Sequence, residues 1–342
     1  VRHRVDDDSA NKGQWILTGS STPLNENRPN HSGAGRIGRI RMNPLTLYES
    51  GLSTGAVSLS GLFEHKFAAA KSEISTQMLL DAVCRGGWPE AVALPVSDAQ
   101  ILIREYMRLT LTESVPRQGK DPDVARRLLD SLARNISQAV TFKTLRKDMY
   151  GTEENLDDFI SERTVSGYTA MFENMFVIDP IKGWVPPARD PKRLQTKARR
   201  YFADPSIAAA MLGMSPAALI GDWQTFGFLF ENLCIRDLLV YARSLLDIGI
   251  EPVRYYRDDS GLECDAIIEL SDGRWGGIEI KSSEDKVPEA SANLCRLKDK
   301  LLRNPSARTR EPKFLAVLVG VGEFAYQRDD GVYVIPVGVL GA

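Results

Sequence analysis

The sequence predicts an α/β protein that contains more than one domain. The chain has 342 residues, whereas domains most often contain about 100 to 200 residues. Its 43% hydrophobic and 26% charged residues are typical of soluble globular domains and exclude collagen-like, low-complexity and disordered classes. In roughly the last 130 residues, candidate strands alternate with candidate helices, which is the pattern of an α/β domain.

The overall charge excludes a strong general attraction to polyanions. Lys and Arg total 43 against 45 for Asp and Glu, for a net charge of -2, so any basic surface must be local. The longest uncharged apolar run near the C-terminus, residues 314–322, is far shorter than the roughly 20 residues of a membrane-spanning helix. No secretory signal opens the chain. We therefore expect a cytoplasmic protein without a membrane partner.

Cysteine and histidine usage restricts the chemistry. The four cysteines are scattered without a C-x-x-C pair, so we expect buried side chains rather than a zinc ribbon or disulfides. The last histidine is His65, which excludes a Ser-His-Asp triad or a histidine-ligated metal wholly within the residues that follow. Chemistry there must use carboxylates, lysine and oxygen-preferring metals such as Mg²⁺ or Mn²⁺.

The first residues read as part of a larger unit. Residues 1–8 are typical of the end of a polar helix, and an apolar strand over 14–17 runs into Thr18-Gly19-Ser20-Ser21, as in an inner strand of a parallel sheet. The chain begins with valine and contains neither G-x-x-x-x-G-K-[ST] nor an apolar run ending in Asp-Glu. We expect the phosphate cradle and the Mg²⁺ carboxylate of a P-loop ATPase to be missing by N-terminal truncation, and this chain not to hydrolyse ATP.

Two stretches, W-I-L-T-G-S-S at 15–21 and G-R-I-G-R-I-R-M-N-P-L-T-L-Y-E at 35–49, carry a family resemblance. They resemble the part after Walker B in bacterial and archaeal AAA-type P-loop ATPases that have a C-terminal domain of unknown function. The resemblance implies ATP as a cofactor of a full-length parent, a possible homo-oligomer, and four nucleotide-related residues: Thr18 or Ser20 at the sensor position and Arg36 or Arg39 as the arginine finger. The alternative interpretation has no role in catalysis: Thr18 and Ser20 lie at a strand-to-turn junction, and Arg36 and Arg39 lie in a solvated loop.

We expect residues 1–49 to be the C-terminal remnant of the AAA ATPase core, with its sensor strand and arginine loop, and residues 50–120 to be a helical lid or connector. Apolar residues at three- and four-residue spacing over 73–84 and 98–113 predict helices there. G-G-W-P-E at 86–90, which also matches the family, interrupts the pattern. We predict a tight turn with a packed tryptophan at this point.

Residues 121–210 have the pattern of a winged helix-turn-helix. Helices are predicted over 123–136 and 141–149, with a third inside 155–176. Three short helices closed by an extended segment can place the third in a major groove. The candidates for contact with nucleic acid on the third helix are Arg163, Thr164 and Ser166.

A basic stretch follows these helices. Residues 181–201 contain seven basic residues against one acidic residue, a local net of +6. Such a stretch beside a recognition helix is a candidate phosphate-contacting wing, with contacts expected from Lys192, Arg193, Lys197 and Arg199. Nucleic acid is the partner that this pattern predicts, although a basic stretch can also be a solvated face.

Residues 211–342 are expected to form a second α/β unit. The predicted order is helix 222–246, strands 253–257, 263–270 and 275–281, helix 288–303, and strands 314–319 and 332–337. Acidic residues fall on the first helix and second strand, and E-x-K on the third strand. This order and these residues resemble the PD-(D/E)XK nuclease core of restriction enzymes. The resemblance implies Mg²⁺- or Mn²⁺-dependent phosphodiester hydrolysis by Asp265, Glu279 and Lys281, with Glu231 as an additional metal ligand.

Strand geometry supports the same residues. Glu279 and Lys281 share a face of their strand because side chains alternate along a strand. For the same reason, we expect Glu263, Asp265 and Ile267 to share a face of the preceding strand. A hairpin through 271–273 would bring Asp265 opposite Glu279, where two carboxylates repel unless a cation lies between them. A bound metal ion would then activate water, and Lys281 would orient that water or neutralise the transition state as a point charge. An edge strand that carries Glu and Lys for solubility would give the same E-x-K pattern.

The family resemblance extends from residue 15 to residue 340 and leaves two functions open. One is an ATPase-coupled, metal-dependent nuclease. The other is an ATP-driven regulatory switch whose winged-helix and nuclease-like domains bind DNA or a partner without cleavage. Binding of a divalent metal at Asp265 and Glu279 would distinguish them, because a binding module has no need of a paired acidic site.

Overall fold

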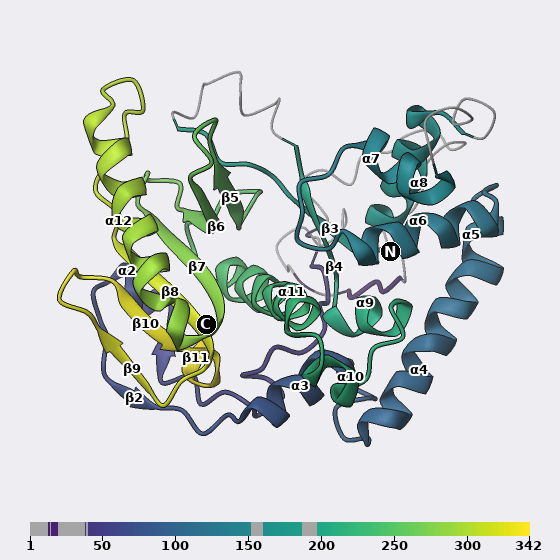
Figure 1. Ribbon diagram of the computed structural model, residues 1–342, viewed down its shortest axis with the longest axis horizontal. Coiled ribbons are helices and arrows are strands. Elements are labelled where there is room, and N and C mark those ends of the chain that lie inside the picture. Colours follow the sequence, from purple (N-terminus) through teal and green to yellow (C-terminus); the bar gives the residue numbers. More distant parts are fainter. Residues whose placement is uncertain (1–12, 14, 20–37, 39, 152–159, 187–196) are drawn as a thin grey trace.

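A computed structural model describes residues 13, 15–19, 38, 40–151, 160–186 and 197–342. Helices gather in one half of the molecule, a mixed sheet forms the other half, and the long helix α11 (Trp223–Arg243) lies between them (Figure 1). The predicted α/β class is therefore confirmed. Within the described residues, no helix has both the length and the apolar character needed to span a membrane.

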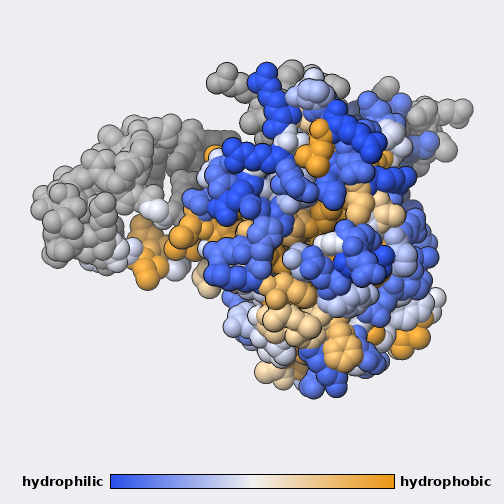
Figure 2. All heavy atoms as spheres, turned by 90° about the vertical axis from the view of Figure 1, so that its left-hand side faces the viewer, coloured by the Kyte–Doolittle hydropathy of each residue, from blue (hydrophilic) through white to orange (hydrophobic). Residues whose placement is uncertain are grey.

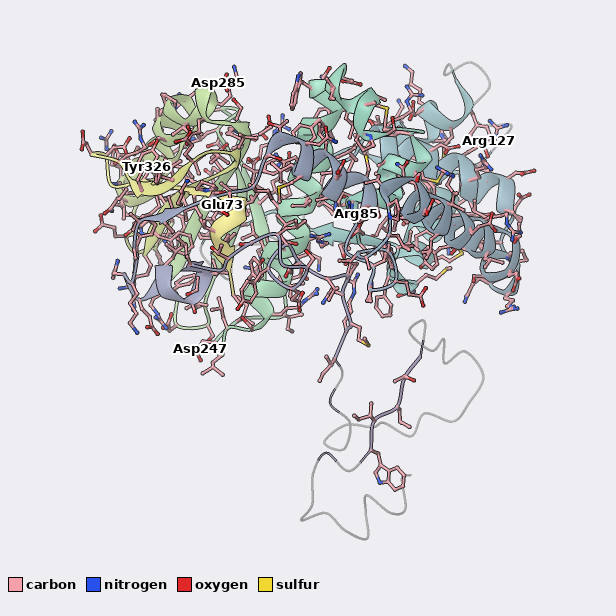
Figure 3. The ribbon with its side chains drawn as sticks, turned by 90° about the horizontal axis from the view of Figure 1, so that it is seen from below. Glu73, Arg85, Arg127, Asp247, Asp285 and Tyr326 are labelled. Carbon is pink, nitrogen blue, oxygen red and sulfur yellow. The ribbon has the colours of Figure 1, made fainter. Side chains whose placement is uncertain are left out.

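The predicted strand at the start of the chain is not formed in residues 15–19. Its apolar side chains are exposed, with Ile16 at 89% and Leu17 at 69%, and the segment extends away from the folded body in Figure 3. An inner strand needs a hydrogen-bonded neighbour on each side, and none of the described strands pairs with this segment. The expected sensor strand of residues 1–49 is thus corrected for this part of the chain.

Capped helices build the helical half. Helix α3 (Thr76–Arg85) begins at Ser75, which accepts a hydrogen bond from an amide of its first turn, and α4 (Val96–Leu109) continues through a π-helical turn, η1 (Thr110–Ser114), into α5 (Val115–Arg117). The three short helices expected between residues 121 and 176 are present, each with a side-chain N-cap: α6 (Pro122–Arg134), α7 (Phe142–Tyr150) and α8 (Glu162–Asn174).

An antiparallel hairpin and two short helices lead from α8 to α11. The hairpin strands are β3 (Ile178–Ile181) and β4 (Arg199–Phe202), and the helices are α9 (Pro205–Met211) and α10 (Pro216–Ile220). The hairpin follows the third helix, as a wing would.

The seven-stranded sheet has the order β2-β9-β10-β8-β7-β6-β5, in which β7, β8 and β10 run parallel and the other pairs are antiparallel. Its strands are β2 (Ala70–Lys71), β5 (Arg254–Arg257), β6 (Glu263–Glu269), β7 (Trp275–Ser283), β8 (Phe314–Val321), β9 (Phe324–Gln327) and β10 (Tyr333–Pro336). The turns η4 (Glu284–Lys286) and η5 (Val337–Val339) follow β7 and β10. Helix α11 shares the large core with one face of the sheet, and α12 (Val287–Arg303) shares a second core with the other face.

Part of the expected connector belongs to this sheet. Strand β1 (Val57–Ser58) pairs with β11 (Leu340–Gly341), and β2 pairs with β9 at the sheet edge. Between them, α2 (Leu59–Phe63) places the Phe63 ring 5.1 Å from the Phe314 ring. The expected assignment of residues 50–120 to a separate connector is therefore corrected for residues 57–71, which pack with the C-terminal sheet. Two-residue strands have no periodicity that a sequence pattern could show.

A β-bulge interrupts β6 between Cys264 and Ile267. The partners of Arg254 and Tyr256 on β5 are Ile267 and Cys264, so β6 carries one extra residue in this interval. As a result Cys264 and Ile267 both pack in the core under α12, which corrects the expected strict alternation. Bulges re-aim side chains and are common beside functional sites.

Candidate acidic site between the sheet and helix α11

The four side chains predicted from the nuclease-like pattern come together. The ladder between β6 and β7 ends at Ala266 opposite Ile278, so the next position along places Asp265 opposite Glu279. The Asp265 Oδ2 atom accepts a hydrogen bond of 2.9 Å from the Ile280 amide. The bulge thus turns the Asp265 carboxylate onto the backbone of β7, next to Glu279 and Lys281.

Lys281 lies between the two carboxylates of the acidic pair, Asp265 on β6 and Glu279 on β7. Its Nζ donates to Glu279 Oε2 at 2.6 Å and lies 3.8 Å from Asp265 Oδ2. Burial and then the charge of Asp265 raise the pKa of the Glu279 carboxyl to about 8. Although burial opposes the charged form of the ammonium, Asp265 and Glu279 raise the pKa of Lys281. Lys281 is therefore held charged in contact with two carboxylates.

Arg199, on β4, enters the same site. Its side chain is only 6% exposed, and its guanidinium forms ion pairs with three carboxylates: Glu263, Asp265 at 3.4 Å and Glu231 at 3.7 Å. The guanidinium also lies over the Tyr255 ring, 4.6 Å from its centroid. The prediction of Arg199 as a phosphate-contacting residue of an exposed wing is therefore corrected: this guanidinium is buried and bound by the protein's own acids.

Alternation along β4 explains which residues reach the site. Arg199 and Tyr201 point the same way, and the Tyr201 hydroxyl donates to Glu231 Oε1 at 2.6 Å. The intervening Arg200 instead lies over Phe142 on α7. Burial, followed by the charge of Asp265, raises the pKa of Glu231 to about 8. Tyr201 and Glu263 were not predicted as site residues, although the two-residue spacing of Arg199 and Tyr201 places both side chains on one face of a strand.

The hairpin that carries Arg199 is anchored to the C-terminal part of the chain. The Asn232 side chain, one residue after Glu231 on α11, both accepts from the Phe202 amide and donates to the Phe202 carbonyl, each at 2.9 Å. At the sheet edge, the Tyr255 hydroxyl donates to the Lys197 carbonyl at 2.6 Å. Trp184 donates its amide to the Tyr255 carbonyl at 2.6 Å and packs under α12. These contacts fix the place of Arg199.

The donor set suits a hard cation chemically, because carboxylate oxygens are what Mg²⁺ and Mn²⁺ prefer. Its arrangement does not suit one. Across the described ranges, no set of three or more Asp, Glu, His or Cys side chains is arranged to hold a metal ion. The site oxygens instead face Arg199, Lys281, Tyr201 and the Ile280 amide.

The other predicted residues lie apart from this site or outside the described residues. Arg163 is exposed and Thr164 half-buried in the first turn of α8, which belongs to the helical half (Figure 1). Lys197 and Thr18 are exposed. The following predicted residues lie outside the described residues: Ser20, Arg36, Arg39, Lys192 and Arg193.

A second buried charge network joins distant segments. Asp204 Oδ2 accepts from the Gly87 amide at 2.9 Å and from Arg236 at 2.8 Å, and Asp237 accepts from the Leu47 amide at 3.0 Å. The Trp88 indole beside this turn donates to a side-chain hydroxyl at 3.1 Å. The predicted tight turn with a packed tryptophan is present, and its role here is structural.

Comparison with known families divides the chain into two regions. A domain of unknown function (DUF8612) matches residues 76–218, and another (DUF4143) matches residues 226–340. The latter is found in AAA-ATPase-associated proteins, which agrees with the broader part of the resemblance stated above. No curated protein and no solved structure gives a significant match to the chain. Arg199 lies in the first region and its carboxylate partners in the second, so both regions contribute to the acidic site.

Proposed function

We propose that this chain is the nucleic-acid-binding part of an AAA-ATPase-associated, ATP-driven switch, whose winged-helix and nuclease-like regions bind nucleic acid without cleaving it. The observation that carries this proposal is the occupation of the acidic site by the protein's own cations. Arg199 and Lys281 together contact Glu231, Glu263, Asp265 and Glu279.

Metal-dependent hydrolysis requires carboxylate oxygens that can accept a cation and its bound water. Both oxygens of Asp265 already have partners, since Oδ1 faces Arg199 and Oδ2 accepts from the Ile280 amide. Burial and the neighbouring charge of Asp265 raise the pKa values of Glu231 and Glu279 to about 8, so both side chains bind a proton more tightly than a solvent-exposed carboxyl does. In this arrangement, the cluster connects β4 to the sheet and does not present a coordination site.

Exposed basic side chains on two elements support nucleic acid as the ligand. The order α6-α7-α8 followed by the β3–β4 hairpin is typical of a winged helix-turn-helix, and Arg163 is exposed in the first turn of α8. Helix α12 lies on a face where hydrophilic residues predominate (Figure 2). An open groove of about 390 Å³ on that helix is lined by Arg296, Asp299, Lys300, Arg303 and Asn304. Such cations attract phosphodiester backbones.

The proposal is tested by fluorescence anisotropy of a labelled DNA duplex titrated with the chain at several salt concentrations. We expect Arg163→Ala to weaken binding and to reduce the salt slope by about 1. Arg108→Ala is the matched control, because Arg108 is also an exposed helical arginine, and it pairs with Glu105 of its own helix. Equal binding by the two variants would show that Arg163 on α8 does not contact the DNA. Absence of binding by the wild type would refute the proposal.

A second candidate is Mg²⁺- or Mn²⁺-dependent phosphodiester hydrolysis, with Asp265, Glu279 and Glu231 as ligands and Lys281 beside them. The sheet register favours it, since it brings Asp265 next to Glu279 and Lys281. It predicts metal-dependent nicking of plasmid DNA that is lost in Asp265→Ala and Lys281→Ala while DNA binding is retained. Unchanged nicking in either variant would exclude this assignment.

A further inference from the structure

We infer that Arg199 is a built-in substitute for a divalent cation, and that replacing it with a neutral side chain turns the acidic cluster into a metal-binding site. The inference rests on the proposed function, in which the site does not cleave, and identifies the residue responsible. The observation behind it is a disagreement between chemistry and geometry. The four carboxylates are of the kind that binds a hard cation, but the described residues are not arranged to hold one.

The cluster requires positive charge. Glu231, Glu263, Asp265 and Glu279 come from α11, β6 and β7 into one largely buried region, where neighbouring carboxylates repel unless a cation compensates them. Lys281 forms an ion pair with Glu279. Arg199 forms ion pairs with the other three carboxylates, Glu231, Glu263 and Asp265. A planar guanidinium with five N–H donors can satisfy several oxygens at once, which a coordinated divalent ion would also do.

Contacts that do not involve Arg199 hold the carboxylates in place. Asp265 is fixed by the Ile280 amide, Glu231 by the Tyr201 hydroxyl, and Glu263 is within 3.1 Å of Arg257. Strand β4 is held by Asn232 through the backbone of Phe202. Loss of the guanidinium would therefore leave three oxygen donors around the space that it occupied.

The strand that carries Arg199 also provides a matched control. Arg200 is the next residue, and its side chain is 11% exposed, close to the 6% of Arg199. Its guanidinium points the other way, 4.7 Å from the Phe142 ring centroid and 4.0 Å from Glu173. Arg200→Met thus removes a buried arginine from the same strand without touching the acidic site.

The experiment is a titration of the 342-residue chain with MnCl₂, followed by calorimetry and by the electron paramagnetic resonance signal of free Mn²⁺. We expect Arg199→Met to bind one Mn²⁺ per chain at least about ten-fold more tightly than wild type or Arg200→Met. Arg199→Lys, which keeps the positive charge, should behave like wild type. Adding Asp265→Asn to Arg199→Met should abolish the gained binding.

The opposing results are equally definite. A folded Arg199→Met chain that binds Mn²⁺ no better than Arg200→Met overturns the inference. If Arg199→Met does not fold alone, folding restored by Mn²⁺ supports the inference, and folding unaffected by Mn²⁺ overturns it. Failure of the proposed function is separate, because it would be seen as metal-dependent nicking by the wild-type chain or as absence of DNA binding.

Discussion

Replacing Arg199 with methionine should destabilise the fold strongly in metal-free buffer. At an effective dielectric constant of about 20, two unit charges 3.4 Å apart, as for Arg199 and Asp265, attract by about 5 kcal/mol before the cost of desolvation. Breaking a buried ion pair by removing one partner costs about 3–5 kcal/mol, since the remaining charge is left uncompensated. We expect a loss in this range for Arg199→Met. For Arg200→Met, whose ion pair is longer and whose ring contact is worth about 1–2 kcal/mol, we expect a smaller loss.

The assay is equilibrium urea unfolding with EDTA present, followed by tryptophan fluorescence. Trp184 and Trp275 lie 5.1 Å apart at their ring centroids, beside the strands of the site, and so report on this region. A double-mutant cycle with Asp265→Asn isolates the pair, because removing both charges should cost less than the sum of the single changes. If Arg199→Met lowers the free energy of unfolding no more than Arg200→Met does, or if the two changes at the site are additive, the buried ion pair between Arg199 and Asp265 does not stabilise the fold.

Two further predictions concern pH and the anchor of β4. The pKa values of Glu231 and Glu279 are raised from 4.5 to about 8, so the folded state binds more protons than the unfolded state between those values. Stability should then fall as pH rises from about 5 to about 8, by up to about 1.4 kcal/mol per pH unit for each group, and level off above. Urea unfolding at several pH values should show this, and Glu231→Gln should reduce the slope; a slope equal to wild type would contradict the burial argument. Asn232→Ala should cost about 2–3 kcal/mol, because it removes two buried hydrogen bonds to Phe202; a change below about 0.5 kcal/mol in the same assay would show that they do not anchor β4.

The sequence predicted those parts of the site that depend on local geometry. Alternation along residues 275–281 and a tight hairpin were enough to bring Asp265 beside Glu279 and Lys281. The three short helices after residue 121 followed from their apolar spacing. These signals arise within a few residues of each other, where periodicity is informative.

Long-range contacts were beyond the same reasoning. Arg199 stood in a strongly basic stretch, which favours an exposed surface, whereas its partner Asp265 is 66 positions away. The bulge in β6 leaves no sequence periodicity, and neither does the two-residue strand β2 that joins the distant β9. The apolar residues 15–17 read as a strand, but a strand forms only where neighbours complete its hydrogen bonds.

The most direct test of the account is a titration of wild-type chain and Asp265→Ala with Mn²⁺, with plasmid nicking measured on the same samples. Because Arg199 and Lys281 already satisfy the carboxylates, we predict no Asp265-dependent Mn²⁺ binding and no nicking. Stoichiometric binding and nicking by the wild type, both lost in Asp265→Ala, would contradict the account and establish a metal-dependent nuclease.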